Sequence, residues 1–427
     1  MHAMVREFAR EQLAAMGADE AGRVRRNHSR YYLDTVRAVM EGAPVAERGA
    51  SLEELRQDYT EIRAAWLNAV AAGAHDLLKG ATEQLCYFLY VRSMMREAVE
   101  LFSAPVESAP LTRHFASIRA NFLVHQGDVE AAGVLASGVL TAEEGPALAR
   151  AHANHVLGNL AHIRGDFEQA NARYQAAFDI RDGIGDLRGC CFASISLGAL
   201  HLLFSRLDTA RHHIKRGYRL ARQIGESFGM LASHVYAGDL AAMENRPEDA
   251  QDNYEMSLRL EDSAPHSQFR AMLHRRLGTL FVLRGDPDSA LGHHQNALDL
   301  ARELGDQRTA AHALIEIGKD WRLIGDITQA RQNLLRGVRL SMTLGIQTCL
   351  QRGLLELSQV ALMLGDVSGA RRLVSVLEGA DLGELRADHD ALLMQLAGGE
   401  FASFAPVTIT DLLNELIAEA ETDTLKL

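Results

Sequence analysis

Residues 151–190 read AHANHVLGNLAHIRGDFEQANARYQAAFDIRDGIGDLRGC, and the four following blocks of forty residues repeat their pattern of small side chains. Glycine occupies the eighth position of every block, and alanine follows it twelve residues later. The glycines are Gly158, Gly198, Gly238, Gly278 and Gly318, and the alanines are Ala170, Ala210, Ala250, Ala290, Ala330 and, one block further on, Ala370. Small side chains allow two helix backbones to approach closely. The spacing therefore predicts a helix–helix contact that recurs in each block.

Two further columns of residues mark turns between helices. The first is Gly165, Gly285, Gly325 and Gly365, with Ser205 and Asn245 in the other two blocks, and the second is Gly185, Gly225, Gly305 and Gly345, with Pro265. Glycine and proline end helices, and the residues between the columns are rich in helix-forming types. Each block is therefore predicted to form a helical hairpin. Because one hairpin cannot bury its apolar face alone, a fixed period of this kind is typical of a solenoid.

The order of residues within a block resembles the tetratricopeptide repeat, in which Leu-Gly is followed by Gly-Asp, by alanine and by a large apolar residue. Tyr174, Tyr254 and Leu334 supply the large residue four positions after the alanine. The period of forty is longer than the thirty-four of that family, but an upstream block from Lys79 to Thr112 keeps thirty-four. The resemblance implies an all-α, right-handed superhelix of helical hairpins. A HEAT-like repeat, whose length is compatible, remains the alternative.

The pattern divides the chain into three predicted regions. Residues 1–78 form a helical segment, with helices at about 21–41 and 51–72. Residues 79–390 form an array of about eight hairpins, five of which have the period of forty at 151–350. Residues 391–427 contain a linker and a helix from Leu412 to Ala420 that caps the last hairpin. Trp321, three residues after a column glycine, is expected to pack between hairpins.

The first seventy residues carry a second resemblance. The segments MHAMVREFAREQL, RNHSRYYLDTV and LEELRQDYTEIRAAWLNAV follow one another before the repeats begin. They resemble the junction between the winged-helix end of STAND-type signalling NTPases and their tetratricopeptide arm, a family that includes ATP-dependent bacterial transcriptional activators. The resemblance implies a sensor or interaction arm that serves an upstream NTPase and winged-helix region. The sequence contains no G-x-x-x-x-G-K-[ST] signature, so no residue is assigned to nucleotide chemistry. A free-standing tetratricopeptide scaffold for complex assembly is the alternative.

Composition narrows the function classes. The formal charge of −12 and the isoelectric point near 5.8 argue against a nucleic-acid-binding surface, which needs clustered Lys and Arg. No apolar stretch reaches the length of a membrane span. The four cysteines form no CxxC pair, which favours a reducing cytoplasm. We therefore expect a cytoplasmic protein that contacts neither nucleic acid nor membrane directly.

The residue types that usually perform catalysis are present without their usual spacing. Histidine pairs such as His212 with His213 and His293 with His294 are adjacent, so the two side chains of a pair point to different helix faces. No H-E-x-x-H metal motif and no G-x-S-x-G nucleophile motif occurs. The acidic pairs lie at predicted helix starts and turns, where capping explains them. We expect no enzyme activity, no metal and no cofactor.

The tetratricopeptide resemblance implies that the first helix of each hairpin lines a concave binding face. Its inward columns fall on His152, His155, Asn159, His162, Phe192, Ile195, Val235, Asp239, Met272, Arg275, Thr279, His312, Lys319 and Arg322. This face would be rich in histidine at one end and cationic near Arg275, Lys319 and Arg322. The expected partner is a protein or peptide, extended or helical, with acidic groups toward the cationic end.

Overall fold

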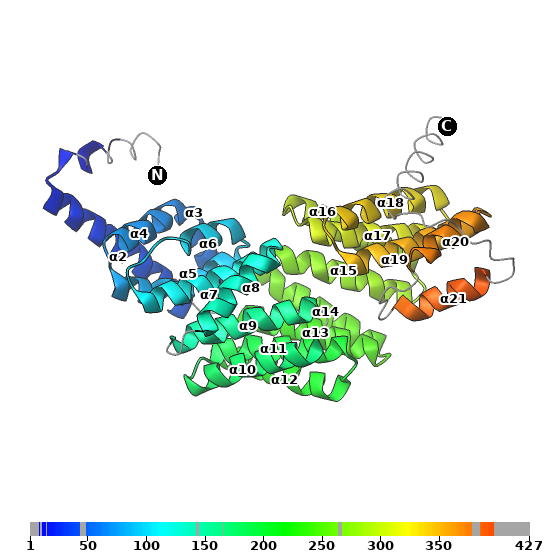
Figure 1. The fold of residues 1–427 in the computed structure, drawn as a ribbon, viewed down its shortest axis with the longest axis horizontal. Helices are drawn as coiled ribbons and strands as arrows, with labels where there is room; N and C mark the ends of the chain where they lie inside the picture. Colours follow the sequence, from blue (N-terminus) through cyan, green and yellow to red (C-terminus); the bar gives the residue numbers. More distant parts are fainter. Residues whose placement is uncertain are drawn as a thin grey trace. The chain divides into compact units, whose positions relative to one another are not determined.

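The computed structural model describes residue 8 and residues 11–13, 15–42, 48–141, 145–164, 166–263, 267–377 and 385–396. In these residues the regular structure is helical and contains no strand, as the sequence predicted (Figure 1). No helix in this part of the chain is long and apolar enough to cross a membrane. The predicted capping helix from Leu412 to Ala420 and most of the first sixteen residues lie outside the described residues.

Three helices precede the repeats: α2 (Ala18–Gly42), α3 (Arg48–Gln57) and α4 (Tyr59–Ala71). The single helix predicted over about 51–72 is therefore wrong, because the chain forms two helices that meet at Asp58. Two hairpins follow, consisting of α5 (His75–Val91) with α6 (Met95–Leu101), and α7 (Ala109–Gln126) with α8 (Val129–Leu140).

The predicted period appears directly in the helix boundaries. The first helices of the later hairpins are α9 (Ala147–Ile163), α11 (Leu187–Leu203), α13 (Ser227–Met243), α15 (Ser267–Leu283), α17 (Gln307–Ile324) and α19 (Gln347–Met363). The second helices are α10 (Phe167–Gly183), α12 (Leu207–Ile224), α14 (Pro247–Ser263), α16 (Pro287–Glu303), α18 (Ile327–Thr343) and α20 (Val367–Ser375). Each set starts at intervals of forty residues. A last helix, α21 (Arg386–Leu396), runs across the region boundary predicted at 390.

The turn columns adopt the backbone conformation that ends a helix. Gly285, Gly325 and Gly365 have φ of 77°, 103° and 78°, in the left-handed region that glycine enters without a Cβ clash. Ser205 and Asn245, which replace glycine in this column, have φ of 54° and 57°. The prediction is confirmed at these positions, whereas Gly165 and Pro265 lie outside the described residues.

The small columns lie where the two helices of a hairpin touch. A Cβ added to Gly158 would lie 2.6 Å from the ring of Tyr174, and one added to Gly318 would lie 2.5 Å from Leu334. Gly198 and Gly278 meet Ile214 and His294 in the same way, at 2.7 and 2.4 Å. Every alanine of the second column is fully buried. Glycine on the first helix therefore receives the large side chain of the second helix, as the pattern predicted.

The chain divides into two compact units. Unit 1 comprises residues 1–244 and 255–266, and unit 2 comprises residues 245–254 and 267–427. In unit 1, fully buried Trp66 packs against the rings of Phe102 and Phe115, and its Nε1 donates a hydrogen bond to the Leu101 carbonyl at 3.2 Å. In unit 2, Trp321 is only partly buried, and it packs against apolar clusters on both sides of its hairpin, which confirms its placement between hairpins.

Candidate binding surfaces on the first helices

One face of the first helices carries the residues that the sequence assigned to ligand binding. We call it the first-helix face and define it by the columns that begin at His152, His155, Asn159, His162 and Val156 and recur every forty residues. The third column is half-buried at all six positions, namely Asn159, Ala199, Asp239, Thr279, Lys319 and Gln359. Such side chains keep part of their surface open to a partner while the helix stays packed.

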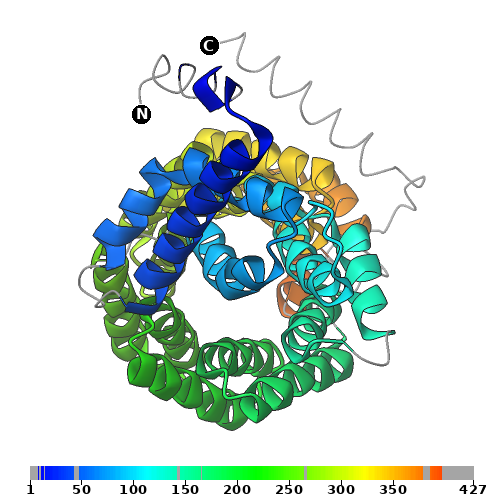
Figure 2. The same ribbon diagram turned by 90° about the vertical axis from the view of Figure 1, so that its left-hand side faces the viewer.

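In unit 1, α5 of the same chain contacts the first helices. Figure 2 shows α5, in light blue, on the inside of the curve formed by the helices of unit 1. Tyr87 of α5 donates a hydrogen bond to Glu226, and the guanidinium of Arg188 lies 4.7 Å from the centre of the Tyr87 ring. Tyr90 meets Phe228 edge-on at 5.7 Å. These contacts join residues far apart in sequence, so α5 acts as an internal occupant of this face.

A polar cluster completes the contact between α5 and the first helices. Glu83 of α5 lies 2.6 Å from His114 Nε2, and both of its carboxylate oxygens lie 3.2 Å from His152 Nε2. Burial alone would raise the pKa of Glu83, but His152 and His114 outweigh it and hold that pKa well below its usual range. The half-buried carboxylate of Glu83 thus accepts hydrogen bonds from two imidazoles.

Glu83, His114 and His152 could also hold a metal ion by distance, because one ligand atom from each lies within 4.8 Å of the others. Arg181 Nη2, however, lies 3.3 Å from His152 Nδ1. Because arginine can only donate, His152 Nδ1 must accept, and Nε2 must carry the proton toward Glu83. In a metal-binding histidine, the N–H of the second ring nitrogen normally donates to an acceptor. This arrangement therefore favours a hydrogen-bonded contact between α5 and α9 over a metal site.

The remaining predicted residues of unit 1 are engaged within their own hairpins. Asn159 accepts a hydrogen bond from the Tyr174 hydroxyl at 2.8 Å, and His162 Nδ1 lies 3.5 Å from the same hydroxyl. The ring of His155 lies 5.4 Å from that of Tyr174, and burial, reinforced by Arg181 and His152, lowers the pKa of His155 to about 3.

Two of the predicted face residues are wrong. Ile195 and Val235 are buried in the core, although Arg275 of the same column is half-buried. The side chain of Ile195 fills the space above Gly217 on α12. Phe192 packs against Phe228 and the aromatic cluster around α5, whereas Asp239 stays half-buried on the face.

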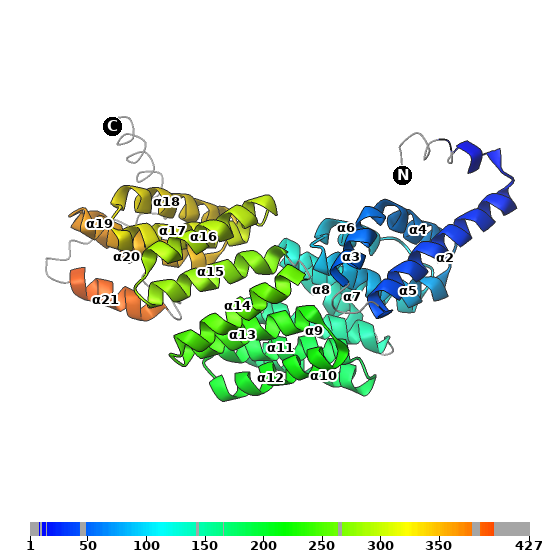
Figure 3. The ribbon, with the colours of Figure 1, turned by 180° about the vertical axis from the view of Figure 1, so that it is seen from behind.

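In unit 2 the first-helix face is charged. The first helices α15, α17 and α19 follow one another side by side (Figure 3). Every predicted residue of this unit is half-buried: Met272, Arg275, Thr279, His312, Lys319 and Arg322. Burial, with Arg275 adding to it, lowers the pKa of His312 to about 4. The assignment of these six side chains to one binding face stays a prediction, and their half-burial leaves part of each side chain exposed.

Two carboxylates on this face were missed by the sequence reading. Glu356 accepts a hydrogen bond from Arg322 Nε at 2.8 Å, and Glu316 lies 3.5 Å from Arg352. Burial would raise the pKa of Glu316, but Arg352, His294, Lys319 and Arg275 outweigh it, so the pKa is lowered. Both glutamates stand four residues after the His312 column, a spacing that keeps side chains on one helix face and could have revealed them.

A buried ion pair joins two helices beneath the unit 2 face. His294 and Asp320 are both fully buried, with His294 Nδ1 at 2.5 Å from Asp320 Oδ2 and His294 Nε2 at 3.1 Å from the Arg275 carbonyl. His294 is therefore a core residue. It occupies the column that holds Tyr174 and Leu334 in other repeats, whereas neighbouring His293 lies 3.0 Å from His274.

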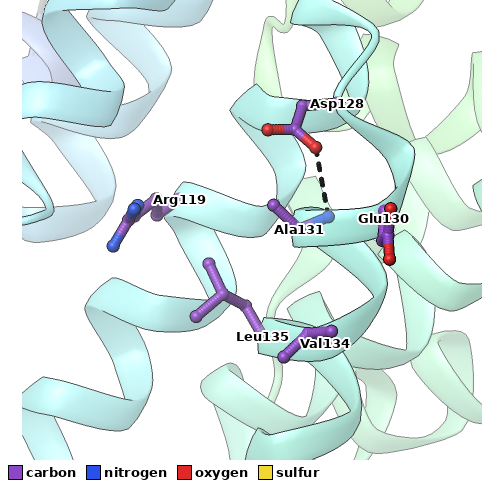
Figure 4. Close-up of a pocket in the computed structure, with 6 residues that line it drawn as sticks. All are labelled: Arg119, Asp128, Glu130, Ala131, Val134 and Leu135. Carbon is purple, nitrogen blue, oxygen red and sulfur yellow. Dashed lines mark hydrogen bonds between the residues drawn. The ribbon is translucent and has the colours of Figure 1, made fainter.

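A shallow depression of about 380 Å³ lies on the α7–α8 hairpin (Figure 4). Its lining includes Arg119, Leu135 and the mostly exposed Val134. The hydrogen bond drawn there, from the Ala131 amide to Asp128, is the cap of α8. Since no set of polar groups converges on the depression, it offers no specific recognition chemistry.

No protein-family model and no curated protein matches the sequence. Solved structures do match. A Rap protein complexed with Competence and Sporulation Factor is 14% identical over 88% of this chain and 96% of its own, with a TM-score of 0.57. NprR in complex with its cognate peptide NprX is 13% identical over 88% of this chain and all of its own, with a TM-score of 0.54.

A third similar structure is a STAND signal-transduction ATPase with a tetratricopeptide repeat sensor from Pyrococcus horikoshii. It is 16% identical over 82% of this chain, with a TM-score of 0.54. The chain spans about half of that protein, 54% of its length. At such low identity these likenesses show the fold alone, which is a tetratricopeptide-like helical-repeat solenoid.

Proposed function

We propose that this chain is a non-catalytic tetratricopeptide-type module that binds a protein or peptide through the first-helix face of unit 2. The observation that carries the proposal is the set of half-buried polar side chains that α15, α17 and α19 place on one face. The matching face of unit 1 already contacts α5. Solenoids of this kind use an extended face of successive repeats for binding.

The charges of the unit 2 face favour an acidic ligand. Its described residues include four cations, Arg275, Lys319, Arg322 and Arg352, against the carboxylates of Glu316 and Glu356. The face therefore keeps a surplus of positive charge next to the half-buried Met272. A peptide with Asp or Glu beside an apolar residue would gain charge-assisted hydrogen bonds and some apolar burial.

The finer proposal is that the module is the sensor arm of a STAND-type transcriptional regulator. It is supported by the resemblance of the first seventy residues and by the likeness to a STAND protein with a tetratricopeptide sensor. The NprR structure, solved with its cognate peptide, supports a peptide-sized ligand. A free-standing scaffold would bind its partners without an NTPase. Measuring partner binding with and without a separately made NTPase and winged-helix region therefore distinguishes the sensor-arm hypothesis from the scaffold hypothesis.

A cytoplasmic location completes the proposal. All four cysteines, Cys86, Cys190, Cys191 and Cys349, are buried and unpaired. Reduced thiols of this kind are usual in a reducing compartment.

An array of peptides of about fifteen residues, graded in Asp and Glu content, tests the binding proposal by fluorescence anisotropy. The double variant Lys319→Glu with Arg322→Glu should weaken the tightest acidic peptide at least about tenfold, because it removes charge-assisted contacts. The matched control reverses two exposed arginines of α18, Arg336→Glu with Arg339→Glu, and should bind as the parent does. Equal loss in both double variants would reject the face in favour of non-specific attraction.

A further inference from the structure

Large aliphatic side chains are exposed at the carboxyl end of six successive first helices. Their exposed fractions are Ile163 54%, Leu203 57%, Met243 46%, Leu283 71%, Leu323 44% and Met363 53%. They stand forty residues apart, so they occupy the same place in each hairpin. An isolated exposed aliphatic residue is ordinary, but a column of them is not explained by packing of the core.

In unit 2 this column widens into a patch. Leu364 and Val367, at the turn between α19 and α20, are 58% and 43% exposed. We call the set Leu283, Leu323, Met363, Leu364 and Val367 the α15–α19 rim. Since neighbouring packed helices lie about 8–10 Å apart, the rim presents an apolar row with one side chain roughly every 10 Å.

Acidic residues border the rim. Asp286, Asp326 and Asp366 follow the column three residues later, where each accepts a hydrogen bond from the backbone of the next helix. Asp288 adds a fourth carboxylate. The basic residue at this edge, Arg284, already pairs with Glu248 at 3.6 Å. The border of the rim is therefore negative.

We propose that the α15–α19 rim binds one amphipathic helix of a partner, with apolar residues seven positions apart and basic residues along one side. Seven residues of α-helix rise about 10.5 Å, which matches the spacing of successive rim side chains. Basic residues beside the apolar stripe would face the aspartates. This surface is separate from the first-helix face and does not depend on its proposed role.

The size of the rim favours a single helix over a second copy of the chain. Five partly exposed aliphatic side chains offer a few hundred Å². A stable protein–protein interface needs about 800 Å² from each partner. A helix laid along the row can use most of the patch, whereas two whole molecules would need additional surface.

The probe for this proposal is a synthetic peptide of three heptads with a leucine stripe, lysines beside it and a fluorescent label. We expect this peptide to bind the full chain. The double variant Leu323→Ser with Met363→Ser should lower its affinity about tenfold or more, since each change removes an aliphatic group that the bound peptide would bury. The matched control is Val24→Ser with Val134→Ser, two exposed apolar residues of unit 1. It should bind like the parent. Helical circular dichroism checks that each variant is folded.

Three results would overturn the proposal. A scrambled peptide of the same composition could bind equally well, which would remove the heptad requirement. A peptide with glutamate in place of lysine could bind as tightly, which would remove the role of the aspartates. Light scattering could show a dimer that only the rim variant dissociates, which would assign the rim to a second copy of the chain.

Discussion

Units 1 and 2 are built from the same repeat, yet their first-helix faces differ. In unit 1 the face meets α5 through aromatic contacts such as Tyr90 with Phe228 and through the Glu83 cluster. In unit 2 the same columns hold arginine, lysine and glutamate that remain half-buried in the described part of the chain. The glycine and alanine columns are common to both. The small residues therefore set the scaffold, and we propose that the face residues decide whether it holds its own helix or a ligand.

The largest expected effect contrasts the two tryptophans. Trp66→Ala should lower the free energy of unfolding of unit 1 by about 3–5 kcal/mol, because a fully buried ring and its hydrogen bond are lost. Trp321→Ala should cost less, since Trp321 is only partly buried. Thermal and urea unfolding of both variants provide the measurement. An equal or larger loss for Trp321→Ala would contradict the burial difference.

The buried pair in unit 2 should be costly to break and inexpensive to replace. Asp320→Ala should destabilise by about 3 kcal/mol, because it leaves His294 without its partner. Position 320 holds leucine in four other repeats, at Leu160, Leu200, Leu240 and Leu280. His294→Leu with Asp320→Leu should therefore recover most of the stability in denaturant titrations. If the double variant were as unstable as Asp320→Ala, the pair would contribute more to stability than an apolar pair that fills the same space.

Two glycines of unit 2 sharpen the rule for the small columns. Gly278→Ala should destabilise by about 1–3 kcal/mol, since the new Cβ would lie 2.4 Å from His294. Gly292→Ala, on the facing helix α16, meets nothing within 4 Å and should stabilise by roughly 0.5–1 kcal/mol. Both are read from urea midpoints. The same sign of change in the two variants would remove the close-contact explanation of the column.

The smallest effect is a pH dependence in unit 1. Burial, reinforced by Arg181 and His152, lowers the pKa of His155 to about 3. The unfolded chain binds protons at an ordinary histidine pKa near 6.5, so stability is full above that pH and falls as the pH drops toward 4. His155 should lower the free energy of unfolding by roughly 1 kcal/mol between pH 6.5 and 5.5. Denaturant titrations of His155→Gln should show a flatter profile, whereas the exposed control His212→Gln should match the parent.

The sequence predicted the hairpins well because their signals are local and repeated. A glycine forty residues from the next glycine needs no knowledge of distant contacts. The sequence could not predict the buried pair of His294 and Asp320, because this contact is neither local nor repeated. Each residue alone appears to be a polar surface residue, and only their contact shows that each partner makes the burial of the other possible. The position of α5 was also beyond the pattern. Tyr87 and Glu226 are 139 residues apart, and no period connects them.

Hydrogen–deuterium exchange with the tightest acidic peptide tests the central claim most directly, because it reports each face separately. We expect bound peptide to slow amide exchange in α15, α17 and α19 and to leave α5, α9 and α11 unchanged. Protection confined to α5, α9 and α11, with none in α15 to α19, would contradict the assignment of the binding face to unit 2.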